Sequence, residues 1–501
     1  MTIYQSIQQL IDCAIGARLV EQEDVVYVRN KILSLLRLDD FVVEESEFFK
    51  KEIPELLEEL IEYACTHEVI ENVLDEKEIL ASKIMDVFIT RPSTVNALFY
   101  EKYEQNPKNA TDYFYKLSKN SNYIQMRQIT KNINYIVNTE YGAIDITINL
   151  SKPEKDPKQI AREKALKSTN YPKCLLCIEN EGYAGRIGHP ARSNHRMIHL
   201  NLTDEKWFLQ YSPYIYYNEH CIVLSAEHRD MKIDRQTFLR LLKFVERFPH
   251  YFLGSNADLP IVGGSILTHD HYQGGNFEFA MAKAQNDFIF ELTDFPEIQC
   301  SIIKWPMSVI RLKSGDIERL VNAGEYVLEK WKGYSDSSVN ICAFTNGTPH
   351  NTITPIVRHR NGIFEMDLVL RNNRTSEEHP LGIFHPHENV HHIKKENMGL
   401  IEVMGLAVLP ARLKTELQEV EKFLLNMSSD IRSYHIPWAK QLKAQYDNRV
   451  NKQNVQHIVR EEVGQKFLQM LENAGVFKRN EEGVGAFKRF ILTLNSKWTE
   501  G

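Results

Sequence analysis

The sequence contains no run of about 18 or more apolar residues, the length that a membrane-spanning helix needs. Its start, MTIYQSIQQL, lacks the basic end and the apolar core of a secretory signal. Cysteine is scarce, with 7 residues in 501, and the number is odd. So few thiols exclude a disulfide framework and agree with a reducing compartment. We therefore expect a cytoplasmic protein with no membrane partner.

Blocks of like charge are also absent. The chain has 60 basic and 67 acidic residues, a formal net charge of -7, and its basic residues are spread along the whole length. This argues against a nucleic-acid partner. The hydrophobic fraction of 43% is typical of packed globular proteins. A chain of 501 residues is expected to divide into two or three domains.

The hydrophobic pattern changes along the chain. Residues 1 to about 115 are helical in pattern, and IPELLEELIEYAC places five apolar side chains on one face, namely Ile53, Leu56, Leu57, Leu60 and Ile61. From about residue 133, INYIVNTEYGAIDITINL alternates and is rich in β-branched residues, which predicts two strands with a turn between them. A second strand-rich block spans about 300–410, and amphipathic helical pattern follows it.

Two histidines and a glutamine alternate in the segment SILTHDHYQGG. On an extended strand the side chains of His269, His271 and Gln273 point to the same face. Imidazole is neutral near pH 7, so such histidines can bind a metal together, or one can be held by a metal while the other acts as a nucleophile. The alternative is a pair of ordinary histidines in a turn. The flanking glycines and Gln273 favour a functional site.

Cys174 and Cys177 are separated by two residues, the gap that lets two thiolates reach one tetrahedral zinc. The sequence has no second pair of this kind, so the remaining ligands would be histidines or carboxylates, with His228 and His269 as the natural candidates. One alternative is a pair of small buried residues in a hairpin. A redox pair is the other, although the thioredoxin-like setting that it needs is absent.

Taken in order along the chain, CLLC at 174–177, SAEH at 225–228 and HDHYQ at 269–273 resemble the galactose-1-phosphate uridylyltransferase family, which belongs to the histidine triad superfamily. The stretches ENEGYAGRIGHPARSNHRMIHL, GGSILTHDHYQGG, PHNTITPI and NMGLIEVMGLAVLPARLK are similar to the longer, Gram-positive class of that family. The resemblance covers about residues 130–420. It implies an α+β fold with two histidine-triad-like halves, each an antiparallel sheet with packed helices, at 121–290 and 291–420. Helical extensions at 1–120 and 421–501 flank them.

The resemblance also implies roles for the motif residues. A structural zinc would have four ligands, namely Cys174, Cys177, His228 and His269. His271 would be the nucleophile of a nucleotidyltransferase that passes a uridylyl group from UDP-glucose to galactose 1-phosphate through a covalent histidine intermediate. Gln273 stands where the superfamily usually has a third histidine. Its amide can hydrogen-bond phosphate oxygens but cannot donate a proton as an acid, which fits a transferase better than a hydrolase.

Further residues are expected to contact the substrates, namely Asn256, Gly264, Ser265, Arg196 and Lys395. Backbone amides near Gly264 and the hydroxyl of Ser265 can donate to phosphate oxygens. Asn256 and Ser265 resemble uridylyl-binding residues of the family at shifted spacing. Lys395 resembles a lysine that binds substrate phosphate, with a solvated lysine as the alternative. Arg196 lies in an arginine-rich segment suited to diphosphate and uracil, or to an ordinary solvated loop.

The shorter class of the family binds a second metal through one glutamate and three histidines. Here His350 is followed by Glu365 and Asp367, without the expected histidine pair, so a second metal stays open. A histidine cluster at 385–392 offers another possible site. Family members are commonly dimers, which implies a homodimer. The alternative functions are another nucleotidyltransferase or phosphorylase of the superfamily, and a zinc-stabilised nucleotide-binding protein without catalysis.

Overall fold

The computed structural model describes residues 1–44, 51–151, 169–264 and 266–495. The chain forms two compact units. The first comprises Met1–Lys131, Ser151–Ile215 and Glu219–His228, and the second comprises Asn132–Leu150, Tyr216–Asn218 and Arg229–Gly501. Within the described ranges, no helix is both long enough and apolar enough to cross a bilayer.

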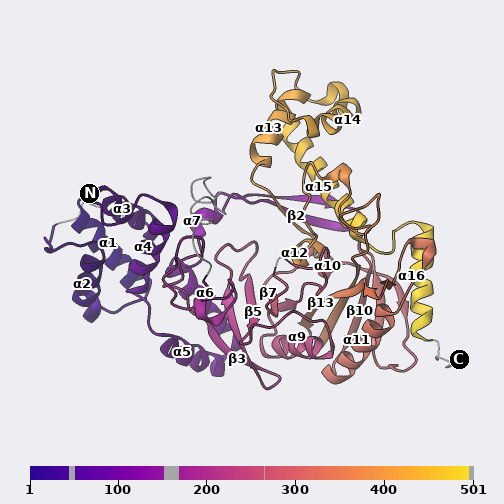
Figure 1. The fold of residues 1–501 in the computed structure, drawn as a ribbon, viewed down its shortest axis with the longest axis horizontal. Helices are drawn as coiled ribbons and strands as arrows, with labels where there is room; N and C mark the ends of the chain where they lie inside the picture. The colour runs from indigo at the N-terminus through magenta and orange to yellow at the C-terminus, as the bar shows by residue number, and fades with distance from the viewer. Residues whose placement is uncertain (45–50, 152–168, 265, 496–501) are drawn as a thin grey trace. The chain divides into compact units, whose positions relative to one another are not determined.

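The first unit begins with helices, labelled in Figure 1. They are α1 Ile3–Gly16, α2 Val25–Leu35, α3 Ile53–Thr66, α4 Leu74–Asp86, α5 Pro92–Gln105, α6 Pro107–Asn120 and α7 Met126–Ile129, with the 3-10 helix η1 at Gln22–Asp24. The predicted apolar stripe of α3 is confirmed, because Leu56, Leu57, Leu60 and Ile61 are buried. They share one core with the apolar faces of α1, α2 and α4.

Three strands complete the first unit, together with the 3-10 helix η2 at Ile178–Asn180. They are β3 Ile198–Leu202, β4 Glu205–Tyr211 and β5 Cys221–Ser225, in the order β3-β4-β5. Both pairings are antiparallel. Thr203 and Asp204 take positive φ values of 52° and 63° at the tight turn between β3 and β4. β5 ends three residues before His228, which is the last residue of the first unit along the chain.

The second unit contains the predicted hairpin at residues 133–148. β1 Ile133–Thr139 and β2 Gly142–Ile148 pair antiparallel, which confirms the two strands and the turn. Gly142 has a φ of 109°, a conformation that favours glycine. β15, Leu406–Leu409, adds to β2 in parallel, so this small sheet joins segments far apart in the sequence.

The larger group of strands in the second unit follows the order β7-β6-β13-β14-β10-β9-β8. The bounds are β6 Phe252–Gly254, β7 His271–Gly275, β8 Asn286–Phe290, β9 Gln299–Ile303, β10 Val309–Ser314, β13 Asn351–Arg360 and β14 Ile363–Asn372, with a small hairpin of β11 Phe344–Thr345 and β12 Thr348–Pro349. All of these pairings are antiparallel. The register aligns Gln273, Gly254, Ile356 and Asp367 across four strands. Directly paired residues share a face of a sheet, so these four positions face the same way.

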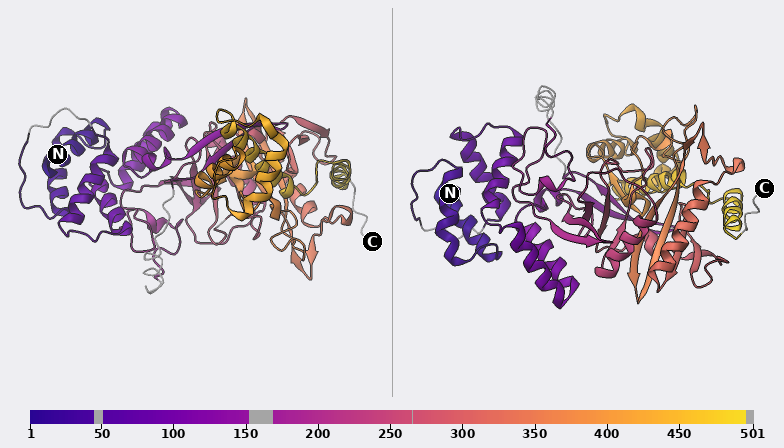
Figure 2. Two further views of the ribbon diagram at one scale, coloured as in Figure 1. Left: turned by 90° about the horizontal axis from the view of Figure 1, so that it is seen from above. Right: turned by 60° about the horizontal axis from the view of Figure 1, so that its bottom comes forward.

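The helices of the second unit are α9 Arg235–Arg247, α10 Ala280–Lys283, α11 Ile317–Lys332, α12 Leu400–Val403, α13 Leu413–Leu424, α14 Ile436–Tyr446, α15 Val455–Ala474 and α16 Glu481–Leu494. The 3-10 helices are η3 Ser337–Val339, η4 Glu388–Val390, η5 Ser433–His435 and η6 Asp447–Arg449. α9 and α11 lie side by side along β13 and β10 (Figures 1 and 2). Helices on antiparallel strands confirm the predicted α+β class.

One face of these strands is closed by α9 and α11. Gly324 of α11 packs tightly against β14 and α9, because a Cβ there would lie 2.9 Å from the sulfur of Met366 and 3.3 Å from the ring of Phe238. Met366 on β14 therefore points to the helices. Its neighbours Glu365 and Asp367 point to the opposite face, which is also the face of Gln273. The predicted boundaries at residues 120, 290 and 420 stay predictions.

Candidate metal centre and nucleophile

The cysteine pair and His228 lie together. The sulfur atoms of Cys174 and Cys177 are 3.6 Å apart, and Nδ1 of His228 is 3.2 Å from the sulfur of Cys177. The amide of Asn180 donates to the carbonyl oxygens of both cysteines at 2.8 Å, which fixes the turn between them. Burial raises the pKa of the Cys177 thiol to about 11. A thiolate at this position therefore requires a cation beside it.

His269 completes a group of four ligand atoms that all lie within 4.8 Å of one another; the other three come from Cys174, Cys177 and His228. Tetrahedral sulfur and nitrogen ligands at about 2.0–2.3 Å from zinc lie roughly 3.3–3.8 Å apart, close to the distances found here. Two thiolates and two imidazoles form a ligand set that suits zinc. These residues therefore fit the group that the sequence predicts, and the cluster can bind a metal ion.

His271, the first residue of β7, is buried. Its Nδ1 lies 2.8 Å from the carbonyl oxygen of His269. A carbonyl only accepts, so Nδ1 carries the proton and donates it, and the lone pair is on Nε2. Burial lowers the pKa of His271 to about 4, which keeps the ring neutral at pH 7. A neutral imidazole with a fixed tautomer can act as a nucleophile through Nε2.

Gln273 follows on the same face of β7 and pairs with Gly254 of β6. A Cβ at Gly254 would lie 2.9 Å from Cδ1 of Leu400 and 3.0 Å from the carbonyl oxygen of Pro355. A side chain at this position would therefore press on Leu400 and on the backbone of β13. Leu400, the first residue of α12, thus packs closely against β6.

Asn256 and Gly264 lie against each other. A Cβ at Gly264 would be 2.7 Å from Nδ2 of Asn256, and at Gly263 it would be 2.5 Å from the carbonyl oxygen of Ala257. The double glycine is thus required by close packing on the 256–259 segment. Oδ1 of Asn256 accepts the backbone N–H of Leu400 at 2.9 Å, so this asparagine also anchors α12. Ser265 lies outside the described residues.

Arg196 is buried and its guanidinium is used within the first unit. It donates to a carboxylate oxygen of Asp86 at 2.7 Å and to the carbonyl oxygens of Thr90, Ser193 and His195 at 2.8 to 2.9 Å. These contacts tie the segment after the cysteine pair to the end of α4. A substrate contact of Arg196 stays a prediction.

The adjacent lysines 394 and 395 differ in burial. Lys395 is exposed, and its predicted contact with substrate phosphate stays a prediction. Lys394 is buried and donates from Nζ to Glu402 at 2.7 Å and to the carbonyl of Val408 at 3.0 Å. The other carboxylate oxygen of Glu402 accepts the N–H of Gly399 at 3.1 Å. The burial of Lys394 could not be predicted from the sequence, because two adjacent lysines carry no signal of which side chain points inward.

Arg371 of β14 is a second buried cation that sequence reasoning missed. It is 1% exposed and donates to the carbonyl oxygen of Met398 at 3.0 Å, while its Nε has no hydrogen-bond partner among the described residues. Burial lowers the pKa of Arg371 to about 10. Together with Asn256, which binds the N–H of Leu400, Arg371 holds the 398–400 segment in place.

The structure does not bring His350, Glu365 and Asp367 together. Asp367 is fully buried and binds Arg311 at 2.6 Å and Arg358 at 2.7 Å, and Glu365 binds Arg358 at 3.1 Å. At about 3.3 Å per residue, His350 lies roughly 25 Å from Arg358 along β13. In the described part of the chain, the Cys-Cys-His-His cluster is the only group of three or more side chains that could hold a metal, and the histidines at 385–392 form none.

Two family models match the chain. The galactose-1-phosphate uridyl transferase N-terminal domain matches residues 18–230, and the C-terminal domain of the same family matches residues 244–440. A galactose-1-phosphate uridylyltransferase of Clostridium perfringens is 54% identical over 492 residues, covering 98% of this chain and 99% of that protein. One of Clostridium acetobutylicum is 51% identical over 497 residues, covering 98% of this chain and 100% of that protein.

Solved structures are more distant. A yeast Ap4A phosphorylase is 10% identical with a TM-score of 0.35, over 75% of this chain and 96% of that chain. The two domain models together cover most of the sequence, and the clostridial relatives match it from end to end at about half of all positions. The chain belongs to the galactose-1-phosphate uridylyltransferase family.

Proposed function

We propose that this protein transfers a uridylyl group from UDP-glucose to galactose 1-phosphate, giving glucose 1-phosphate and UDP-galactose, with His271 as the nucleophile. The observation that carries the proposal is the buried imidazole whose Nδ1 proton is donated to the His269 carbonyl oxygen at 2.8 Å, so that Nε2 has the lone pair. Nearly full-length relatives that carry the name of this activity support the choice of substrates.

In the first half-reaction, Nε2 of His271 attacks the α-phosphorus of UDP-glucose. A P–N bond forms, and the bond from that phosphorus to the bridging oxygen breaks, so glucose 1-phosphate leaves with the electron pair. The ring becomes positively charged while its Nδ1–H continues to donate to the carbonyl of His269, which strengthens that hydrogen bond. A phosphate oxygen of galactose 1-phosphate then attacks the same phosphorus, the P–N bond breaks, and UDP-galactose is released.

Gln273 would donate its amide N–H to a non-bridging oxygen of the transferred group. It lies two residues from His271 on the same face of β7. An amide stabilises charge on phosphate oxygens but offers no acidic proton and no base for water. The uridylyl-enzyme would then persist until a sugar phosphate arrives, as a transferase requires.

We propose zinc as the metal, with the four ligands Cys174, Cys177, His228 and His269. When bound, the ion supplies positioning of the strand and no open coordination position for water. His269 would then hold a fixed carbonyl oxygen for His271, so the tautomer of the nucleophile depends on the same residue that binds the metal. Removal of the ion should therefore disorder the nucleophile and not merely the cysteine turn.

The remaining residues that we expect to contact the substrates are also part of the proposed uridylyl transfer, namely Asn256, Gly264, Ser265, Arg196 and Lys395. Asn256 is supported by its close contact with Gly264 and its hydrogen bond to the N–H of Leu400. We also propose a homodimer in the cytoplasm. Sedimentation of the purified protein tests the dimer, and a sedimentation coefficient of a 58.4 kDa monomer would contradict it.

The proposal is tested by the intact mass of the protein after mixing with UDP-glucose alone. We expect a uridylyl adduct that maps to His271 under alkaline conditions and that galactose 1-phosphate discharges. His271→Gly should form no adduct, while the control His199→Gly, at an exposed histidine of β3, should form it normally. An adduct on another residue, or full transfer activity in His271→Gly, would contradict the mechanism.

A further inference from the structure

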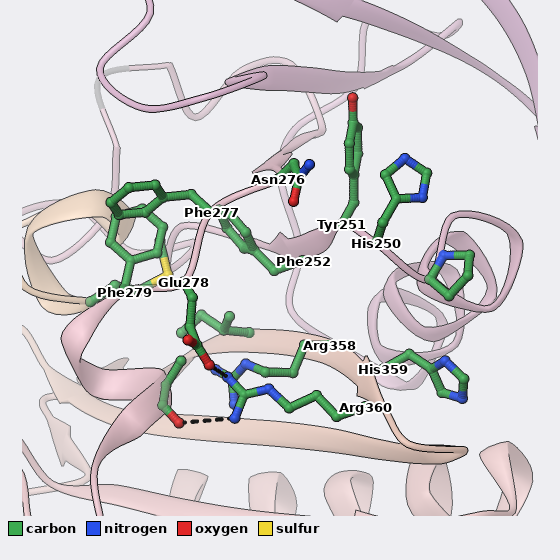
Figure 3. Close-up of a pocket in the computed structure, with 14 residues that line it drawn as sticks. His250, Tyr251, Phe252, Asn276, Phe277, Glu278, Phe279, Arg358, His359 and Arg360 are labelled. Atoms are coloured by element: carbon green, nitrogen blue, oxygen red, sulfur yellow. Dashed lines mark hydrogen bonds and ion pairs between the residues drawn. The ribbon is translucent and has the colours of Figure 1, made fainter. Parts of the chain in front are cut away.

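A cavity of about 590 Å³, including its part open to solvent, lies beside the start of β6 (Figure 3). Its lining includes Phe252, which pairs with Gly275 and with Arg358. Phe252 is thus on the face of Gln273 and Asp367, opposite to α9 and α11. Gly275 is four residues from His271, or roughly 13 Å along β7 at about 3.3 Å per residue, so the cavity is separate from the nucleophile.

Two arginines of β13 form the floor of the cavity, as Figure 3 shows. Arg358 is buried and its guanidinium is held by Glu365 at 3.1 Å and Asp367 at 2.7 Å. Arg360 is 33% exposed and donates to the carboxylate of Glu278 at 2.7 Å. A guanidinium has five N–H donors. The contact with Glu278 and a second contact with a backbone carbonyl at 3.3 Å use only some of them, so donors of Arg360 are left for a ligand.

Glu278 is the group that a ligand would replace. Its side chain is 53% exposed, and an ion pair as exposed as Glu278–Arg360 contributes little net stability. With Glu278 turned to solvent, Lys283, which lies 3.8 Å from Glu278, loses that partner. The ion pairs of Glu365 and Asp367 then contain four cations and two carboxylates, namely Arg311, Lys313, Arg358 and Arg360 with Glu365 and Asp367. An excess of two positive charges matches a phosphate dianion better than a single carboxylate.

Aromatic rings line the part of the cavity above the arginines (Figure 3). Phe277 and Phe279 meet edge to face at 4.7 Å, and Phe252 and Phe279 at 5.3 Å. Phe277 is only partly buried, so part of its ring is left for a ligand. An apolar wall next to a cationic group suits a ring that carries an anion.

We propose that this cavity is a second, non-catalytic site that binds a hexose phosphate, with the phosphate on Arg360 and the sugar ring against Phe277. Binding exchanges the carboxylate of Glu278 for the phosphate group. Arg358 stays paired with its two carboxylates and holds the floor in place. The site is independent of the uridylyl transfer proposed for His271.

The test uses full-length protein with ¹³C-methyl-labelled methionine, titrated with glucose 6-phosphate. Met404 lines the cavity, whereas Met398 lies beside Arg371 in the region proposed for the substrates. We expect a saturable shift of the Met404 methyl signal. Arg360→Gln should weaken binding at least about tenfold through loss of a charge-assisted contact, and Glu278→Gln should strengthen it several-fold.

Arg235→Gln is the matched control, because Arg235 is also 33% exposed and pairs with Glu318 at 2.8 Å elsewhere in the unit. It should bind glucose 6-phosphate as the wild type does. Glucose should cause no saturable shift, and glucuronate, with the same ring and a carboxylate, a weaker one. No Met404 shift, a shift of Met398 alone, equal affinity in Arg360→Gln, or glucuronate binding as tight as the phosphate would overturn the proposal.

Discussion

At the residue scale, His269 and His271 have different proposed roles just before and at the start of β7. His269 contributes a ligand atom to the cysteine cluster and a carbonyl oxygen to Nδ1 of His271. A metal bound to that ligand atom would fix the backbone, and the carbonyl contact fixes the tautomer of His271. The proposed metal site and the proposed nucleophile therefore depend on the same residue through two different atoms.

This division predicts different outcomes for two substitutions. Cys174→Ser should lose the bound metal and lower the midpoint of thermal unfolding, because a structural site contributes its binding free energy to folding. His271→Gly should keep the metal and the unfolding midpoint but lose transfer by at least about 10³-fold. Metal content by mass spectrometry and calorimetry check both variants. Equal metal content in the two proteins would contradict the ligand assignment.

A second prediction concerns Asp367 and pH. Burial alone would raise the pKa of this carboxyl, but the charges of Arg311 and Arg358 outweigh it and hold the pKa well below 3.8. The unfolded chain then binds more protons near and below pH 3.8, so the stabilisation is complete above that pH and is lost as the pH falls. Urea unfolding between pH 6 and pH 3 should show a falling free energy, with a smaller slope in Asp367→Asn. Identical slopes would refute the argument.

At the scale of elements, the short helix α12 is held by three buried polar contacts. Lys394 binds Glu402, Asn256 binds the N–H of Leu400, and Arg371 binds the carbonyl of Met398. A helix of four residues has little stability of its own, so these side chains determine where it lies. The segment that carries Lys395 is positioned by the same contacts.

The two adjacent lysines provide a matched pair for a third prediction. Lys394→Met should lower the free energy of unfolding by about 3–5 kcal/mol, because it leaves the charge of Glu402 buried without its partner. Lys395→Met removes an exposed side chain, so stability should change by less than about 0.5 kcal/mol. If Lys395 binds substrate phosphate, the KM of the Lys395→Met variant for galactose 1-phosphate should rise. Chemical denaturation measures the change in stability, and steady-state kinetics measures the change in KM. A loss of stability in Lys395→Met but not in Lys394→Met would contradict the assignment of the buried lysine.

Elements with local patterns could be predicted from the sequence, and long-range pairings could not. The stripe of α3 and the hairpin at 133–148 follow from periodicities of 3.6 and 2 residues. The order β7-β6-β13-β14 has no such local signal, because register is set by partners distant in sequence. β14 is instructive. Alternation of Glu365, Asp367 and Arg371 with apolar residues ordinarily marks a solvated face, yet this face is buried. Glu365 and Asp367 pair with Lys313 and Arg358, and Arg371 donates to the carbonyl oxygen of Met398.

At the scale of the whole molecule, the sequence identified the chemistry more completely than the architecture. The four predicted metal ligands come together, and Asn256 and Gly264 pack against each other near the strand of His271. The carboxylates of Glu365 and Asp367 instead pair with arginines, and the buried cations Lys394 and Arg371 were not foreseen. Burial of a charged residue depends on partners from other segments, and a single sequence does not show them.

A fourth prediction concerns the turnover of the complete enzyme. If the uridylyl group stays on His271 between two half-reactions, glucose 1-phosphate must leave before galactose 1-phosphate reacts. Initial rates at several fixed concentrations of one substrate should therefore give parallel double-reciprocal lines. Exchange of labelled glucose 1-phosphate into UDP-glucose should proceed without galactose 1-phosphate. Intersecting lines and no exchange would indicate direct transfer between the two bound sugars.

The parallel pairing of β15 with β2 has a consequence for how the chain is made. The hairpin of residues 133–148 leaves the ribosome long before residues 406–409, which complete its sheet. At roughly 5–20 residues per second, synthesis of the intervening chain takes on the order of 10–50 s. During that interval one edge of β2 lacks its final partner and can pair with other strands. Nascent chains should therefore depend on chaperones most strongly between the emergence of the hairpin and that of β15.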